Sequence, residues 1–338
     1  ILMMNNINTK VQDIKSLKEI TVPINEDIHL FRKELKDSLR SEVRLINILA
    51  KYMMMRRGKH IRPYLTIFSA HICGEPTANS YRAAAMIEML HVATLIHDDV
   101  VDEANLRRGW ATLHKKWKNK LSVLMGDYIL SKSLINMIKI KDFEVLELIS
   151  GTAEQMSSGE ILQIEKNSRK AVSEKLYYDV ISRKTASLFS ASCELGSLTT
   201  TNNLEDRKAM KDFGQNFGMA FQIKDDLFDL LAREADIGKD VAHDVKKSMI
   251  TLPYIHSFRT LKKSDQKRMN TIIRTKKKTP QIIRELRNLI EKGDGFDYAR
   301  KKIDDFSNNA MMAIKTYEDS SYKKSMVDLL VFNAHRIK

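Results

Sequence analysis

The chain has 338 residues, of which 43% are hydrophobic, 30% charged and 7% aromatic, enough apolar material for one large core and too much for a disordered chain. Its 12 glycines and 5 prolines are too few for the frequent turns of a β-sandwich or barrel. The Gly-rich phosphate loops of nucleotide-binding α/β folds are also absent from the sequence. The composition therefore predicts long helices with few interruptions.

The chain is strongly basic, with a formal net charge of +14. A basic protein attracts polyanions such as nucleic acid, anionic lipid or phosphorylated small molecules. A base-stacking surface would require aromatic residues interleaved with the basic ones, and none interleave with the late basic runs at 276–278 and 300–302. We therefore expect no nucleic-acid partner, and the basic runs are typical of solvated helix faces.

Cysteine usage and hydropathy indicate the compartment. The two cysteines, Cys73 and Cys193, are too few for a disulfide scaffold and fit a reducing environment. No apolar run approaches the roughly 18 residues needed to cross a bilayer. The N-terminus lacks the basic region and apolar stretch of a secretion signal. The sequence thus predicts a cytoplasmic protein.

In chain order, residues 1–25 are polar and irregular and are predicted to form an N-terminal arm. From residue 26 to residue 338, apolar residues recur with the helical period, and Gly, Pro and Asn positions interrupt it. One clear example of this period is the set Leu121, Leu124, Met125, Tyr128 and Ile129. The pattern predicts a single all-α domain, residues 26–338, built as a large antiparallel helical bundle.

The first candidate site ends an apolar helix. Asp98 and Asp102 are four residues apart, so on a helix they share a face with a rise of about 6 Å between them, and Asp99 lies beside Asp98. The same D-D-x-x-D spacing returns at residues 225–229, again on an apolar helix. Asp is a minor residue type, so chance rarely gives this spacing twice in one chain.

The apolar neighbours of both motifs favour packing into the core over two solvated acidic faces, which are the simpler alternative. Six carboxylates near one cavity would repel one another without counter-cations. Mg²⁺ prefers oxygen ligands and binds through a few carboxylates together with phosphate oxygens. The two motifs therefore favour a magnesium–phosphate site.

Basic residues at four places in the sequence could complement the two motifs: Lys59 and Arg62, Arg107 and Arg108, Arg183 and Lys184, and Lys239. Each alone is typical of a solvated surface. Together with the aspartates they suit a site for two diphosphates, one held through Mg²⁺ and one held directly by Lys and Arg.

In these residues the chain resembles the trans-isoprenyl diphosphate synthase (polyprenyl synthetase) family, closest to its long-chain, octaprenyl-type members. Four motifs carry the resemblance: L-I-H-D-D-x-x-D with R-R-G at 95–109, K-T-A-x-L-F at 184–189, F-Q-x-x-D-D-x-x-D at 221–229 and T-L-P at 251–253. The resemblance extends from Lys59 to Arg336. It implies a homodimeric all-α bundle around a deep central cavity, and a Mg²⁺-dependent prenyltransferase. Such an enzyme condenses isopentenyl diphosphate with an allylic diphosphate, releases pyrophosphate and repeats the cycle.

The resemblance also implies a role for each residue at the site. Metal binding, to three Mg²⁺ ions, falls to Asp98, Asp99, Asp102, Asp225, Asp226 and Asp229. Isopentenyl diphosphate binding falls to Lys59, Arg62, His91 and Arg108. Allylic diphosphate binding falls to Arg107, Lys184, Thr185, Gln222 and Lys239, of which Lys184, Thr185 and Gln222 are the catalytic candidates.

Three positions depart from the family pattern. In the usual G-G-K-R-x-R-P motif, Arg57 replaces a Gly and His60 replaces a basic residue. In the loop after Lys239, Met249 stands where the family usually has a second Lys.

Product length is expected to depend on the helix before Asp98. Short-chain members of the family typically carry a bulky aromatic residue four or five positions before this Asp, where this chain has small side chains. The positions that would line the tunnel are Thr94, Ala93, Leu90 and Ile87. These residues favour a long-chain product of C30–C45, used as a quinone side chain, with a geranylgeranyl or farnesyl diphosphate synthase as the alternative.

Other functions remain open at this stage: a class I terpene cyclase, a non-catalytic prenyltransferase subunit, and a basic helical nucleic-acid-binding protein. Two intact Asp-rich motifs argue against the first two. A long apolar product must leave into a bilayer, so the late basic runs are also candidates for peripheral contact with anionic lipid.

Overall fold

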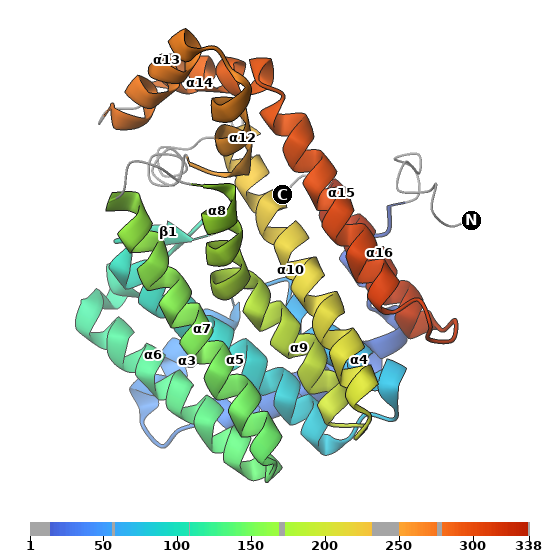
Figure 1. The fold of residues 1–338 in the computed structure, drawn as a ribbon. Coiled ribbons are helices and arrows are strands. Elements are labelled where there is room, and N and C mark those ends of the chain that lie inside the picture. The colour runs from blue at the N-terminus through green and yellow to red at the C-terminus, as the bar shows by residue number, and fades with distance from the viewer. Residues whose placement is uncertain are drawn as a thin grey trace.

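The computed structural model describes residues 14–55, 58–107, 109–168, 173–231, 250–275 and 279–336. Within these ranges the chain is a bundle of helices, as expected, and its strands are the two-residue β1 (Leu106–Arg107) and β2 (Trp110–Ala111) (Figure 1). In the labels below, η marks a 3₁₀ or π turn. The helices are α1 (Leu17–Ile20), η2 (Val22–Ile24), α2 (Asn25–Leu39), α3 (Arg44–Met55), α4 (Ile61–Cys73), α5 (Ala78–Val101), α6 (Leu113–Ile140), α7 (Phe143–Ser168), α8 (Glu174–Ile181), η3 (Ser182–Ala186), α9 (Ser187–Leu198), α10 (Leu204–Leu231), α12 (Leu252–Thr260), α13 (Lys263–Arg274), α14 (Pro280–Lys292), α15 (Gly295–Ala313) and α16 (Ser321–His335).

Helix α5 forms the centre of the bundle and packs against α2, α4, α6 and α9. Thr77 and Ser80 form a capping box at its start. From Ala83 to Leu90 every residue is buried, so this part of α5 is covered on all sides rather than along one stripe. The helix therefore runs through the core and carries the first aspartate motif at its end.

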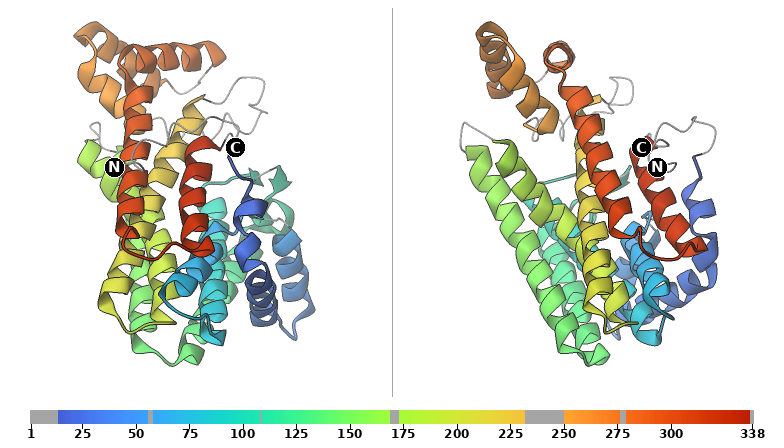
Figure 2. Two further views of the ribbon diagram at one scale, coloured as in Figure 1. Left: turned by 90° about the vertical axis from the view of Figure 1, so that its right-hand side faces the viewer. Right: turned by 45° about the vertical axis from the view of Figure 1, so that its right-hand side comes forward.

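Two hydrophobic clusters hold the bundle together. The larger joins α1 to α7 with α9, the first half of α10 and α16, and includes Phe31, Phe68 and Phe189. The smaller joins α8 and the second half of α10 to α12–α15. Figure 2 shows α13 and α14 beyond the end of α10, attached through α12 and α15. Helix α10 belongs to both clusters, and the second aspartate motif lies on its second half, where Ile223, Leu227 and Leu230 are buried in the smaller cluster.

The predicted N-terminal arm is shorter than expected. Residues 17–24 already form α1 and η2, with Ile20 and Ile24 buried in the larger cluster. The Ser325 hydroxyl on α16 donates to the carbonyl oxygen of Ile20 at 2.8 Å. These two isoleucines, four residues apart, anchor a segment that is otherwise polar. Because most of its residues are polar, the sequence pattern did not predict a helix there. Residues 1–13 of the arm lie outside the described residues.

Helix α6 is long and rich in apolar residues. By length and composition alone it is the one helix among the described residues that could cross a membrane, although the sequence suggested none. It packs along α5, and α7 lies beside it at the edge of the bundle (Figure 1). Its exposed apolar side chains include Leu124, Ile135 and Ile138.

Neither of the two pockets described in the structure is lined by an aspartate of the two motifs. One, of about 390 Å³, is lined by Tyr178 of α8 and by residues of α15, and another, of about 940 Å³, lies between α2 and α3. The deep central cavity stays a prediction.

Candidate active site

The first aspartate motif lies at the C-terminal end of α5, with Asp102 as the residue that ends the helix. This end of a helix carries partial negative charge, so carboxylates there need nearby cations. Asp99 is 6% exposed, and the Nε of Arg107 donates to its carboxylate at 2.7 Å. Arg107 reaches back because β1 and β2 form a tight hairpin in which Gly109 has φ +79°.

Asp98 faces a second cation, the ammonium group of Lys184. Burial raises the pKa of Asp98 to about 6, and Lys184 and Arg107 partly oppose that rise. Lys184 itself forms an ion pair with Glu160 and donates to Gln163 Oε1 at 3.2 Å. Asp102 is exposed at the rim of this group.

The second aspartate motif lies in the last turns of α10. Both carboxylate oxygens of Asp226 accept hydrogen bonds, one from the Tyr177 hydroxyl at 2.6 Å and one from Gln222 Nε2 at 2.8 Å. Burial raises the pKa of Asp226 to about 6, although both donors act to lower it. Asp229 is exposed one turn further along.

Asp225 is paired with a cation from the far end of the chain. Arg336, which ends α16, donates from Nη2 to Asp225 Oδ1 at 2.5 Å and to the carbonyl oxygen of Phe221 at 3.2 Å. Its guanidinium lies 4.1 Å from the centre of the Phe221 ring. Burial raises the pKa of Asp225, and the charges of Arg336, Arg62 and Lys59 oppose that rise.

Lys184 connects the two motifs. Its positive charge acts on Asp98 of the first motif and on Asp226 of the second. It lies on η3, a π-helical turn between α8 and α9, and such turns are frequent at functional sites. The charge of Lys184 therefore opposes the effect of burial on one aspartate in each of two segments that are far apart in sequence.

The predicted isopentenyl diphosphate residues lie together on the Asp225 side. Arg62 Nη1 and His91 Nε2 are 3.1 Å apart, and the Arg62 guanidinium lies 4.1 Å from the centre of the Phe189 ring. Lys59 lies over the Phe332 ring at 5.3 Å. Arg108 lies outside the described residues.

The predicted allylic residues divide between the two motifs. Arg107 is paired with Asp99 of the first aspartate motif. The Thr185 hydroxyl donates at 2.8 Å to Oε1 of Gln222, which is itself hydrogen-bonded to Asp226 of the second. Lys239 and Met249 lie outside the described residues, as does Arg57. His60 stands where the family's G-G-K-R-x-R-P motif has a basic residue. Its Nδ1 lies 3.0 Å from the carboxylate of Glu88.

The donor chemistry fits magnesium. The described residues contain no group of three His, Cys, Asp or Glu side chains close enough to hold a metal without other ligands. Mg²⁺ is commonly bound by one or two carboxylates and completed by substrate phosphates and water. Asp98, Asp102, Asp225 and Asp229 offer carboxylate oxygens of that kind, without a thiol or imidazole that would suit zinc.

Comparison with known proteins decides the family. The sequence model of the polyprenyl synthetase family matches residues 43–290. The chain belongs to the polyprenyl synthetase family.

Relatives and solved structures cover nearly the whole chain. It is 30% identical to the all-trans-nonaprenyl-diphosphate synthase (geranyl-diphosphate specific) of Rhodobacter capsulatus, over 95% of this chain and 98% of the relative. It is 30% identical to the octaprenyl diphosphate synthase of Haemophilus influenzae, over 97% and 99%. A polyprenyl synthase from Caulobacter crescentus, solved with calcium and isoprenyl diphosphate, superposes with a TM-score of 0.89 at 27% identity, over 96% and 99%. The predicted family, all-α fold and prenyltransferase class are thereby confirmed.

In this polyprenyl synthetase the predicted chain-length residues lie on the buried part of α5. Ile87, Leu90 and Ala93 are at most 2% exposed. Thr94 is half-buried, and its hydroxyl donates to the carbonyl oxygen of His91 at 2.9 Å. Thr94 is thus joined by a hydrogen bond to His91, one of the residues predicted to bind isopentenyl diphosphate.

Sequence reasoning missed Tyr177, Glu160, Gln163 and Arg336, which contact the predicted site residues directly. Arg336 is 111 residues from Asp225, and Tyr177 is 49 residues from Asp226. A single polar residue in an amphipathic helix carries no local signal of this kind. No local pattern in the sequence would have singled out Arg336.

Proposed function

We propose that the chain is a Mg²⁺-dependent enzyme that condenses isopentenyl diphosphate with an allylic diphosphate and repeats the cycle to a long-chain product of C30–C45, supplying a quinone side chain. The geometry that supports the proposal is that η3, which carries Lys184, is hydrogen-bonded through Thr185 to Gln222 beside Asp226, while the charge of Lys184 also opposes the raised pKa of Asp98. Two carboxylate clusters around one cation suit a pyrophosphate held by several positive charges.

Three Mg²⁺ ions would be held by Asp98, Asp102 and Asp225, with Asp99, Asp226 and Asp229 close by. When bound, they supply Lewis-acid stabilisation of the negative charge on pyrophosphate. The raised pKa of Asp98 reflects a buried carboxylate that lacks sufficient positive charge around it, which is the situation that a divalent cation relieves.

Binding of the two diphosphates is divided between the two groups of basic residues. Lys59, Arg62 and His91 hold isopentenyl diphosphate on the Asp225 side, together with Arg108. Arg107, Lys184 and Lys239 hold the allylic diphosphate and stabilise the departing pyrophosphate as its C–O bond breaks. Such charges act most strongly where water is excluded.

Heterolysis leaves an allylic carbocation, which needs nearby oxygen atoms. Thr185 and Gln222 offer these oxygens beside Lys184. The double bond of isopentenyl diphosphate then attacks the cation, and a proton is lost. Among the described residues of the site no side chain is placed as a dedicated base, and we propose that the departed pyrophosphate accepts that proton.

Several features support a long product. Ala93 is small and buried five residues before Asp98, where a bulky aromatic residue would block growth. The nonaprenyl and octaprenyl relatives are named as long-chain synthases. A geranylgeranyl or farnesyl product is the alternative.

We also propose that the protein is a cytoplasmic homodimer. Apolar side chains of α6 and its neighbour α7 are exposed, among them Leu124, Ile138 and Phe143, and we propose that a second copy covers them. The basic side chains of α15 support weak peripheral contact with anionic lipid during product release.

The decisive experiment supplies the purified protein with farnesyl diphosphate, labelled isopentenyl diphosphate and Mg²⁺, and separates the products by chromatography. We expect a ladder ending between C30 and C45. Ala93→Phe should shorten it, whereas Ala299→Phe, a buried alanine of α15, should lower stability without shortening it. No transfer of label would overturn the proposal, and a C15–C20 end product would favour the short-chain alternative.

A further inference from the structure

Beyond the proposed function, on which this rests, we infer that Asp226 and Tyr177 are positioning residues that fix the direction of the Thr185 hydroxyl. They act through Gln222. The result is that Thr185 Oγ1 keeps its lone pairs available for the cationic allylic carbon. Asp226 thereby has a positioning role in place of the metal contact that the family resemblance implies.

The hydrogen bonds form one line with a single direction. An ionised carboxylate only accepts hydrogen bonds. Asp226 accepts from the Tyr177 hydroxyl at 2.6 Å and from Gln222 Nε2 at 2.8 Å. The Gln222 amide must therefore turn its nitrogen toward Asp226 and its oxygen away from it.

That orientation determines the hydroxyl of Thr185. Gln222 Oε1 can only accept, and it lies 2.8 Å from Thr185 Oγ1, so the hydroxyl proton points at Gln222. If the amide were reversed, its NH₂ group would donate to Oγ1 and push the hydroxyl proton toward the substrate. A proton pointing at a carbocation would raise the energy of the transition state, whereas lone pairs lower it.

The line is held rigidly in the core. Tyr177 is 5% exposed and lies on α8, which directly precedes the π turn η3. Thr185 is 9% exposed and lies within that turn. Two glycines allow neighbouring helices to approach that turn. A Cβ at Gly159 of α7 would lie 2.8 Å from the Lys184 nitrogen, and one at Gly218 of α10 would lie 2.6 Å from Ala186 Cα.

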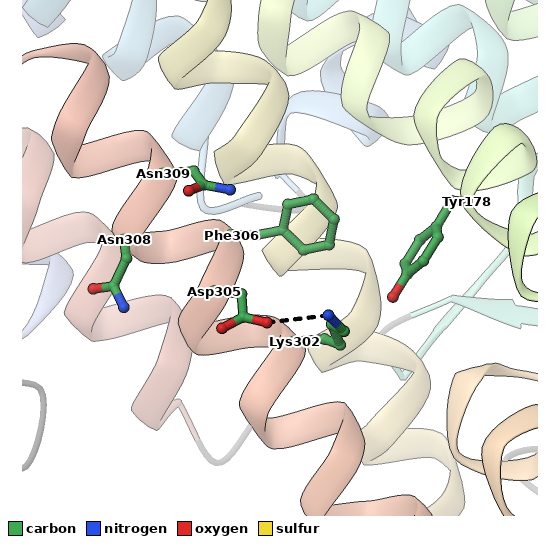
Figure 3. Close-up of a pocket in the computed structure, with 6 residues that line it drawn as sticks. All are labelled: Tyr178, Lys302, Asp305, Phe306, Asn308 and Asn309. Atoms are coloured by element: carbon green, nitrogen blue, oxygen red, sulfur yellow. Dashed lines mark hydrogen bonds and ion pairs between the residues drawn. The ribbon is translucent and has the colours of Figure 1, made fainter.

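The neighbouring tyrosine provides a matched control. Tyr178 is on the same helix, but its side chain lies in the pocket formed with α15, beside Lys302 and Phe306 (Figure 3). Tyr178→Phe removes a phenolic hydroxyl from α8 without touching the line from Tyr177 to Thr185.

The first test compares kinetics. We expect Tyr177→Phe to lower kcat roughly ten-fold and Asp226→Asn roughly 100-fold, because Asn offers one acceptor where two donors arrive. The KM for isopentenyl diphosphate and the Kd for magnesium pyrophosphate, measured by calorimetry, should stay within about two-fold. Tyr178→Phe should match wild type in kcat.

A double-mutant cycle tests the route of the effect. In a Thr185→Val background, Tyr177→Phe should cost no further kcat, while Thr185→Ser should keep the sensitivity to Tyr177→Phe. Additive losses in Tyr177→Phe/Thr185→Val, or a loss carried by KM, would overturn the inference, because a purely structural effect of Tyr177 would not depend on the Thr185 hydroxyl.

A binding measurement makes the test independent of turnover. The probes are an allylic diphosphate analogue with an ammonium nitrogen at the reacting carbon and its neutral hydrocarbon counterpart, each titrated with Mg²⁺ present. Wild type should prefer the cationic probe, and Tyr177→Phe should reduce that preference about ten-fold while Tyr178→Phe keeps it. An unchanged preference in Tyr177→Phe would overturn the inference, whereas absence of prenyl transfer by wild type would overturn only the proposed function.

Discussion

The two aspartate motifs have the same spacing but are stabilised in different ways. The first lies at the end of α5 and pairs with Arg107, eight residues from Asp99 on the adjoining hairpin. The second lies within the last turns of α10, and its partners Tyr177 and Arg336 are 49 and 111 residues away. Identical local sequence patterns therefore acquire different electrostatic surroundings, one from a nearby turn and one from the packing of distant helices.

The largest expected effect comes from removing a carboxylate from either motif. Asp98→Ala and Asp225→Ala should each lower kcat by about 10²–10³-fold or more, because each removes charge that holds pyrophosphate. Circular dichroism should remain that of the native helical protein. Near-normal turnover in one variant would contradict a role of that motif in holding pyrophosphate.

Removing the basic partner of each motif tests local against distant pairing. Arg107→Met leaves the carboxylate of Asp99, 8% exposed in its side chain, with less compensation and should cost about 2–3 kcal/mol of unfolding free energy. Arg336→Met should cost about 1–2 kcal/mol, because the Asp225 side chain is 38% exposed and partly screened. Urea unfolding without Mg²⁺ measures both. A stability of Arg336→Met equal to wild type would show that the distant ion pair contributes nothing.

The π turn between the motifs can be displaced through Gly159. Gly159→Ala places a Cβ 2.8 Å from the backbone nitrogen of Lys184 and should destabilise the fold by about 1–3 kcal/mol. Gly151→Ala is the matched control on the same helix, since nothing lies within 4 Å of its Cβ, and it should stabilise by up to about 1 kcal/mol. Thermal unfolding measures the stability of both variants. Equal stabilities would mean that the close approach of α7 to the π turn at Gly159 does not restrict the side chain there.

A further expected effect is a pH dependence shared by the two motifs. Burial raises the pKa of both Asp98 and Asp226 to about 6, above the ordinary value of 3.8. The folded state then binds more protons than the unfolded state between about pH 4 and 6, so these groups reduce stability as the pH rises through that interval. Unfolding free energies without Mg²⁺ should show this slope, and Asp98→Asn should remove part of it. A flat profile in both proteins would contradict the desolvation of Asp98.

Much of the site could be predicted because its parts are local motifs. D-D-x-x-D, K-T and the Lys59–Arg62 pair each occupy a few consecutive positions, and helical periodicity places their side chains on known faces. The contacts of Asp225 and Asp226 could not be predicted, because Arg336 and Tyr177 become neighbours only when α16 and α8 pack against α10. The helical anchoring of Ile20 and Ile24 escaped notice for the same reason, since their burial depends on α16.

By itself the sequence determined the helical class, the family and the residue types that meet the diphosphates, because composition, period and motif spacing are properties of neighbouring positions. The tertiary structure alone decided which cation compensates which carboxylate and which way the Thr185 hydroxyl points. Those outcomes depend on the distances between helices that are far apart in the chain, and an electrostatic or hydrogen-bonding partner is chosen by proximity in space.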